Sequence, residues 1–172
     1  GGNDSFTRAS VEAARWLEAT AARTPGLKIV CPDLLEATFL VESRGRLPIV
    51  DIGKISVGAD AAKDLAGGRL IWIRRAEKGG LYNPLIDSLE KAAGRTELAV
   101  FRPPGGAVAL TVYRARVSDV AAASRAWASA IASVSGNDSY NSATLWLEKA
   151  AELSREGGSS PADRAAALEL AH

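Results

Sequence analysis

The sequence predicts an α/β or α+β fold with a mixed sheet of about five strands, flanked by helices and followed by a helical C-terminal third. Three observations support this prediction. Short apolar runs alternate with segments of helical periodicity through the middle of the chain. Two strand-like runs joined by Pro-Pro-Gly-Gly indicate an antiparallel hairpin over about 97–117. Only helical patterns follow that hairpin.

The first half of the chain is expected to alternate helix and strand. Asp4 or Ser5 suits the N-cap of the first helix, and Thr-Pro-Gly at 24–26 ends it. A later β-branched segment contains Gly53, which indicates a bulge or a break between two short strands. The expected elements are a helix over 5–23, a strand over 27–31, a helix over 32–44 and strand structure over 47–58.

The second half holds the clearest single strand and the clearest helix start. The short apolar run over 69–75 indicates a strand buried on both faces. Asn83 followed by Pro84 is typical of a helix start, because Asn caps well and Pro suits the first helical position. The remaining expected elements are helices over 59–68, 84–93, 118–135 and 139–156, a short helix after 160, and strands over 96–102 and 107–117.

Size and composition indicate one globular domain without a dominant charge. The 172 residues suit a single domain, and we expect 137–172 to form a helical C-terminal extension packed on or beside it. Lys and Arg total 21 and Asp and Glu total 20, whereas a dedicated DNA coat or a polybasic membrane protein is usually far more lopsided. An electrostatic partner must therefore bind a local patch. No apolar run approaches the roughly 18 residues that a membrane span needs.

The residue inventory argues against several chemistries. His172 is the only histidine and Cys31 the only cysteine, so a Ser-His-Asp triad, a Cys-His pair or a zinc site has too few residues. The chain has no phosphate-binding P-loop, no dinucleotide glycine motif and no His-Glu-x-x-His. We expect no cofactor and no metal. The sequence leans toward a protein without catalysis but leaves that question open.

The best candidate ligand site follows the strand over 69–75. Two arginines end that strand, a lysine follows, and two glycines let the backbone approach a ligand. The next helix begins with exposed amides whose dipole favours an anion. The residues concerned are Arg74, Arg75, Lys78, Gly79, Gly80 and Tyr82. The alternative is an ordinary turn, because soluble connections commonly contain glycine and charged residues.

Weaker catalytic candidates are Glu42, Asp51 and Lys54. Metal-dependent nucleases pair carboxylates with a lysine near the scissile phosphate, the carboxylates holding Mg²⁺. Strand alternation places Asp51 and Lys54 on opposite faces unless Gly53 forms a bulge. The alternative is a set of solvated charges at a strand end.

A second basic group suggests contacts to nucleic acid. Arg102, Arg114 and Arg116 belong to the predicted hairpin and are expected to share a face. Tyr82, Tyr113 and Trp72 would then supply stacking platforms of the kind that single-stranded nucleic-acid binders use. The alternative for Trp72 is burial in the core.

Four tryptophans in an alanine-rich chain suggest a partner surface or self-association through the Trp-bearing helices. Our leading hypothesis is a non-catalytic α/β module, regulatory or adaptor in role, that binds a protein partner or a small anionic ligand. The alternative is a protein that binds nucleic acid or processes phosphate esters with a metal. The single cysteine slightly favours the cytoplasm. The start Gly-Gly-Asn-Asp-Ser without methionine indicates a processed N-terminus, so localisation stays open.

Overall fold

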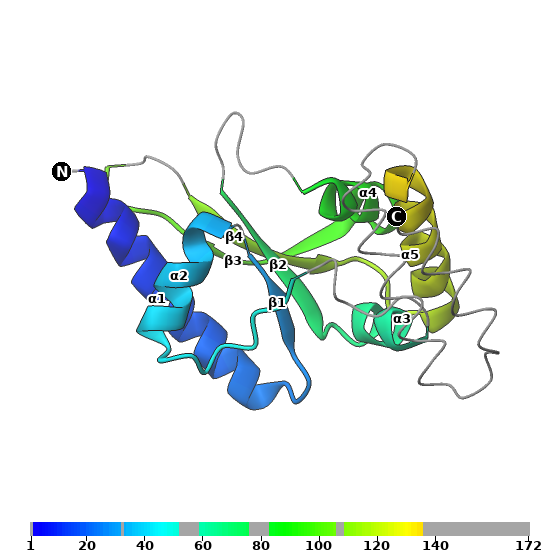
Figure 1. Ribbon diagram of the computed structural model, residues 1–172, viewed down its shortest axis with the longest axis horizontal. Coiled ribbons are helices and arrows are strands. Elements are labelled where there is room, and N and C mark those ends of the chain that lie inside the picture. The colour runs from blue at the N-terminus through cyan, green and yellow to red at the C-terminus, as the bar shows by residue number, and fades with distance from the viewer. Residues whose placement is uncertain (1, 32, 52–58, 76–82, 106–108, 136–172) are drawn as a thin grey trace, which may run out of the picture. The chain divides into compact units, whose positions relative to one another are not determined.

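The computed structural model describes residues 2–31, 33–51, 59–75, 83–105 and 109–135 (Figure 1). They confirm the α/β class, with helices and one mixed sheet. In chain order the elements are α1 (Gly2–Arg23), β1 (Lys28–Val30), α2 (Asp33–Glu42), α3 (Ala59–Ala66), β2 (Leu70–Arg75), α4 (Pro84–Ala93), β3 (Arg95–Phe101), β4 (Leu110–Ala115) and α5 (Val120–Ser135). No helix in these ranges is long and apolar enough to cross a membrane.

The chain forms two units that are discontinuous in sequence. The first consists of residues 1–50, 67–82 and 95–116 and contains the sheet with α1 and α2. The second consists of 51–66, 83–94 and 117–172 and contains α3, α4 and α5. The helical extension predicted over 137–172 lies outside the described residues and stays a prediction.

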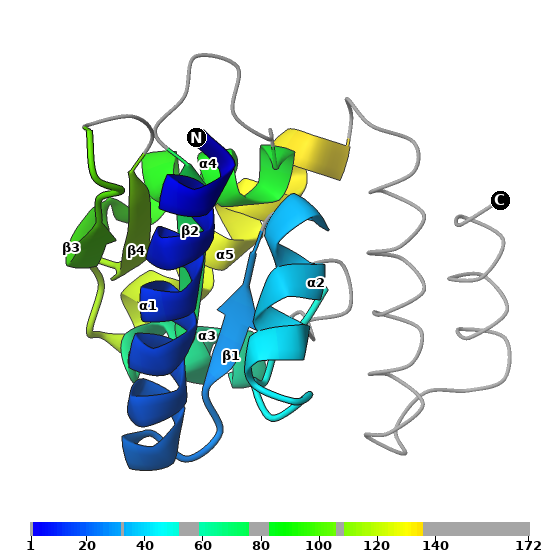
Figure 2. The ribbon, with the colours of Figure 1, turned by 90° about the vertical axis from the view of Figure 1, so that its left-hand side faces the viewer.

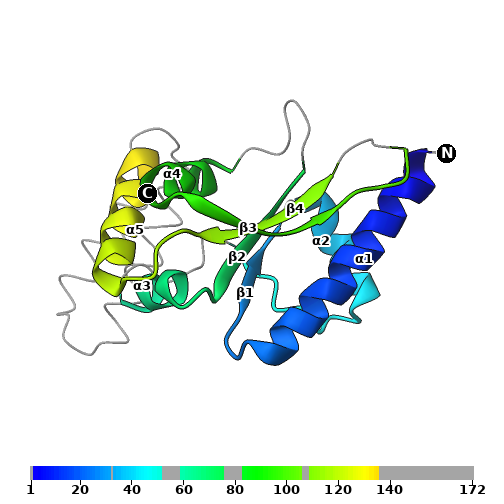
Figure 3. The same cartoon turned by 180° about the vertical axis from the view of Figure 1, so that it is seen from behind.

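The sheet of the first unit has the strand order β1-β2-β4-β3 (Figure 3). β1 pairs with β2 in parallel, and β4 is antiparallel to both β2 and β3. Three strands therefore run in the same direction, and β4 runs against them. The carboxyl ends of β1, β2 and β3 meet at one edge of the sheet, and their amino ends meet at the other.

The described residues form four strands, where the sequence suggested about five. The segment expected to be a strand over 47–58 contributes only an isolated parallel bridge between Ile49 and Ile29. The Ile29 N–H donates to the Pro48 carbonyl at 3.0 Å, and the Val50 N–H donates to the Ile29 carbonyl at 2.9 Å. Proline has no N–H to extend a ladder, and β1 offers only three residues to pair with. Residues 52–58, including Gly53, lie outside the described part.

The core of the first unit lies between one face of the sheet and the helices α1 and α2, which lie side by side (Figure 2). Alternation along the strands supplies one side of this core, and the helical stripes supply the other. Its main side chains are Ala13, Ala14, Leu17, Leu35, Phe39, Ile71, Ile73, Leu110 and Val112. Trp16 meets Phe101 edge to face, with ring centroids 6.2 Å apart.

Two helix boundaries differ from the prediction. α1 begins at Gly2, so Asp4 and Ser5 lie inside the helix and neither is its N-cap. α2 ends at Glu42 in a Schellman motif: the Gly45 N–H donates to the Leu40 carbonyl at 2.8 Å, and the Arg44 N–H donates to the Val41 carbonyl at 3.1 Å. The motif needs a left-handed residue, which here is Arg44 at φ 54°.

The predicted hairpin is confirmed. β3 and β4 pair antiparallel from Arg95 opposite Ala115 to Phe101 opposite Leu110. The register shifts between Glu97 and Ala99, which marks a bulge. The strands end closer together than 97–117 implies, so the connection is longer than the Pro-Pro-Gly-Gly turn alone.

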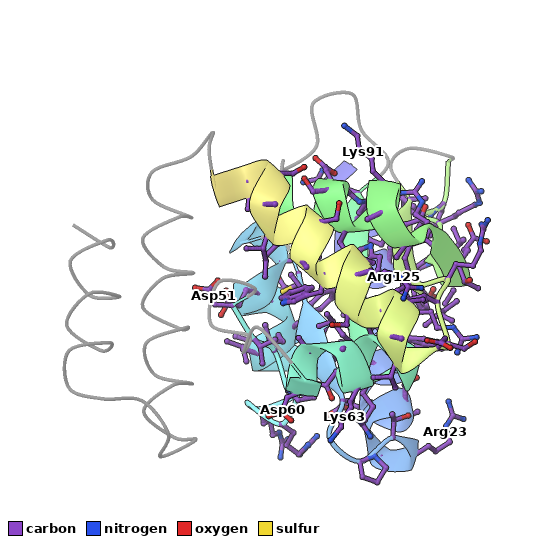
Figure 4. The ribbon with its side chains drawn as sticks, turned by 90° about the vertical axis from the view of Figure 1, so that its right-hand side faces the viewer. Arg23, Asp51, Asp60, Lys63, Lys91 and Arg125 are labelled. Atoms are coloured by element: carbon purple, nitrogen blue, oxygen red, sulfur yellow. The ribbon has the colours of Figure 1, made fainter. Side chains whose placement is uncertain are left out.

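The helices of the second unit are capped largely as predicted. The Asn83 side chain accepts from the N–H groups of Leu85 and Ile86, each at 3.1 Å, and Gly94 at φ 71° follows the last turn of α4. α5 begins behind Asp119, whose carboxylate accepts from the Ala122 N–H at 2.9 Å. α5 packs on both α3 and α4 (Figure 4). The buried side chains of these helices are Ala61, Ala62, Leu65, Leu85, Ile86, Leu89, Ala123, Ala126, Trp127, Ala130 and Val134.

Candidate anion-binding site

Three arginines lie at the carboxyl edge of the sheet. Arg74 and Arg75 are the last residues of β2. Arg75 pairs with Leu110 of β4, and Leu110 pairs with Phe101, the last residue of β3. Arg102, which follows Phe101, is therefore at the same edge as the other two. The sequence hypothesis placed Arg74 and Arg75 in this site but grouped Arg102 elsewhere, because strand order is not visible in a single sequence.

The two arginines of β2 project to opposite faces of the sheet. β2 continues through Arg75, and successive side chains of a strand alternate. Arg75 shares the face of Ile71 and Ile73, which packs on α1 and α2, whereas Arg74 shares the face of Trp72. The pair therefore does not form a clamp on one face. Each side chain reaches the common edge along its own side of the sheet.

Burial distinguishes these arginines from solvated turn residues. Arg74 and Arg75 are half-buried, and the Nε atom of Arg75 is fully shielded from solvent. Arg102 is exposed. Half-burial lets the aliphatic stem of an arginine cover apolar surface while its guanidinium stays at the edge. Thr111, opposite Arg74 in β4 and 6% exposed, adds a hydroxyl on the same face.

The helix start that was expected to complete this site is already used internally. Asn83 occupies the N–H groups of Leu85 and Ile86, and Pro84 has no N–H to donate. These donors are therefore not available to a bound anion in the described conformation. The other predicted ligand residues, Lys78, Gly79, Gly80 and Tyr82, lie outside the described residues.

The weaker catalytic candidates form no cluster. Glu42 is the exposed last residue of α2 in the first unit, and Asp51 is an exposed residue of the second. Lys54 is outside the described part of the chain. Across the residues that are described, no three Asp, Glu, His or Cys side chains come close enough to hold a metal ion.

The hairpin arginines do not form the group that the sequence suggested. Arg114 lies in β4 opposite Ile71, near the start of β2, and Arg116 follows the end of β4. Arg102 is at the other end of the hairpin. Strand order thus divides the predicted group between the two edges of the sheet.

The aromatic platforms are also fewer than predicted. Trp72 is 1% exposed, so it belongs to the core and offers no face to a base. Tyr113 is half-buried, with the Arg95 guanidinium 4.1 Å from its ring centre. Of the tryptophans expected to form a partner surface, Trp127 is 2% exposed and Trp16 is half-buried against the first core. Trp146 lies beyond the described residues.

Net charge differs sharply between the two units. The first holds fourteen Lys and Arg against eight Asp and Glu, a formal charge of +6. The second holds seven against twelve, a formal charge of −5. The near-neutral total hides this difference because the units interleave along the chain. Counting charge by unit is the signal that sequence analysis lacked.

Comparison of the chain with protein-family models, with curated proteins and with solved structures finds no match. The site is therefore interpreted from its own geometry.

Proposed function

We propose that this chain is a non-catalytic α/β binding module that takes a small anionic ligand at the carboxyl edge of its sheet. One observation carries the proposal: strand register gathers Arg74, Arg75 and Arg102 at one edge of a unit with a formal charge of +6. A module of this kind suits a regulatory or adaptor role, in which ligand binding alters contacts with a protein partner.

The chemistry of the edge favours a phosphate or a carboxylate. A guanidinium stays protonated at any physiological pH and donates two parallel hydrogen bonds to a planar or tetrahedral oxyanion. Partial burial strengthens such bonds, because the local dielectric constant is lower than that of water. Arg102 supplies an exposed first contact, and the half-buried Arg74 and Arg75 supply stronger ones.

A thermal-shift titration with inorganic phosphate, pyrophosphate and citrate tests the proposal. A ligand at about one hundred times its Kd stabilises the folded state by about 2.7 kcal/mol, which is readily visible as a shift in Tm. The test variant is Arg74→Gln combined with Arg102→Gln, and Arg75 is retained because its Nε is buried. The control is Arg8→Gln combined with Arg15→Gln, which removes the same charge from exposed positions on α1.

We expect at least one anion to raise Tm in the wild type and the control, with little or no effect in the test variant. The absence of a shift with every anion would refute the proposal. An equal shift in all three proteins would refute it as well, since binding would then not depend on the carboxyl edge.

The alternative of metal-dependent phosphate-ester processing depends on Glu42, Asp51 and Lys54, which no described cluster supports. Adding Mg²⁺ with a generic phosphodiester to the same panel tests it. Turnover that disappears in Asp51→Asn would favour the enzyme over the binding module.

A further inference from the structure

A second and larger group of cations lies at the opposite edge of the sheet, where the amino ends of β1, β2 and β3 meet the carboxyl end of β4. We call this group the basic rim. It takes one side chain from the end of α1 and the others from all four strands or the residues that adjoin them. Its members are Arg23, Lys28, Arg69, Arg95, Arg114 and Arg116.

Strand register makes the rim continuous. The Lys28 N–H donates to the Arg69 carbonyl at 2.7 Å, which joins the starts of β1 and β2. Arg114 stands opposite Ile71, at the start of β2. The Arg116 guanidinium donates to the Arg95 carbonyl at 2.8 Å, which joins the end of β4 to the start of β3. Adjacent strands are about 4.8 Å apart, so the rim spans roughly 14 Å across its three strand gaps.

Two glycines let the rim arginines lie across the turns. A Cβ at Gly68 would lie 3.5 Å from Nη1 of Arg114, and a Cβ at Gly26 would lie 3.6 Å from Cδ of Arg69. Both glycines have positive φ, 68° and 79°, which other residues rarely adopt. The long side chains therefore lie along the edge over backbone without side chains of its own.

The rim is accessible and poor in acid. Arg23, at the end of α1 (Figure 4), and the three arginines of the hairpin end are exposed, while Lys28 and Arg69 are half-buried. The residues of the four strands include one acid, Glu97, two positions after Arg95. Like charges held this close repel one another, and a bound polyanion relieves that repulsion.

We propose that the basic rim binds the phosphate backbone of a nucleic acid without reading its sequence. Six cations spread over roughly 14 Å exceed what one small anion can contact, whereas a polymer presents a phosphate about every 3.4 Å along each strand. Arginine is also the residue that recognises phosphate most often through paired hydrogen bonds.

An acidic protein fits the rim less well. Interfaces between proteins generally have an apolar centre. The large apolar side chains that are exposed within the described ranges are Val41 on α2 and Val120 on α5, and neither belongs to the rim. The rim goes beyond the site proposed above, since it lies at the other edge of the sheet and uses none of the same residues.

Salt-dependent binding of fluorescently labelled oligonucleotides tests this proposal. The probes are a single strand and a duplex, each about 12 nucleotides long. Fluorescence anisotropy then gives Kd over roughly 50 to 200 mM salt. If all six cations contact phosphates, the slope of log K against log salt is about −4 for the single strand and about −5 for the duplex. The form with the tighter Kd identifies the preferred nucleic acid.

The rim variant is Arg114→Gln combined with Arg116→Gln, and its matched control is Arg8→Gln combined with Arg15→Gln. Both lose two charges, and the control residues are exposed on α1 outside the rim. We expect the rim variant to flatten the slope by about 1.4 for the single strand or about 1.8 for the duplex. The control should keep the wild-type slope. Tm without ligand verifies that each variant is folded.

Three results would overturn the proposal. The first is the absence of binding at the lowest salt. The second is an equal loss in the rim variant and the control, which would show that only overall charge matters. The third is displacement of the oligonucleotide by a polyglutamate of equal charge at equal concentration, which would indicate an acidic protein partner. Arg74→Gln with Arg102→Gln separates the two proposals, because it should abolish the shift with small anions and leave oligonucleotide binding intact.

Discussion

Exchanging Arg44 for glycine is expected to stabilise the protein, although arginine has the larger side chain and the higher helix propensity. Arg44 occupies the left-handed position of the Schellman motif that ends α2, at φ 54°. In this region the Cβ of an L-residue crowds the following carbonyl, which costs about 1–2 kcal/mol. Glycine avoids that cost but loses about 0.5–1 kcal/mol more backbone entropy on folding. The difference is a net stabilisation of about 0.5–1 kcal/mol.

The adjacent glycine provides the matched control in the opposite direction. Gly45 has φ 73°, and a Cβ at this position would meet no atom within 4 Å. Gly45→Ala therefore tests backbone conformation without a steric contribution, and we expect it to destabilise the protein by about 0.5–1 kcal/mol. Arg44 and Gly45 are both exposed, so neither exchange removes buried surface.

Urea unfolding followed by circular dichroism measures both effects. The midpoint should rise for Arg44→Gly and fall for Gly45→Ala, with the m-value unchanged in each. A lower midpoint for Arg44→Gly would refute the reasoning, because it would mean that the Arg44 side chain contributes more than its backbone conformation costs. An unchanged midpoint for Gly45→Ala would refute the left-handed assignment itself.

Three further predictions concern single elements, and thermal or urea unfolding measures each of them. Asn83→Ala should cost about 1–2 kcal/mol, because the side chain caps two N–H groups of α4; Asn83→Asp, which keeps the acceptor, should restore most of the loss. Phe39→Ala should cost about 3–5 kcal/mol, since Phe39 is 0% exposed in the core of the first unit; a cost below about 1 kcal/mol would contradict that placement. Glu18→Gln should cost about 0.5 kcal/mol or less and nothing in high salt, because its 3.0 Å ion pair with Arg46 is largely exposed; a salt-independent loss would show that the pair is more shielded than its 29% and 64% exposures indicate.

Much of the local structure followed from the sequence by itself. Asn83, Pro84 and Gly94 specified both ends of α4, because capping depends on side chains within a few residues of the helix end. The hairpin and the doubly buried β2 were also predicted, since apolar runs and turn residues act over short distances. The lack of histidine and cysteine likewise narrowed the chemistry without any structure.

Strand order and charge distribution emerged only in the tertiary structure. Placing β4 between β2 and β3 brought Arg102 to the edge of Arg74 and Arg75, and left Arg114 and Arg116 at the other edge. The fifth strand failed because Pro48 cannot donate and β1 is short, which depends on a partner distant in sequence. The basic rim and the opposite charges of the units were hidden for a related reason: the units interleave along the chain, so a sequence nearly neutral in total folds into one basic part and one acidic part.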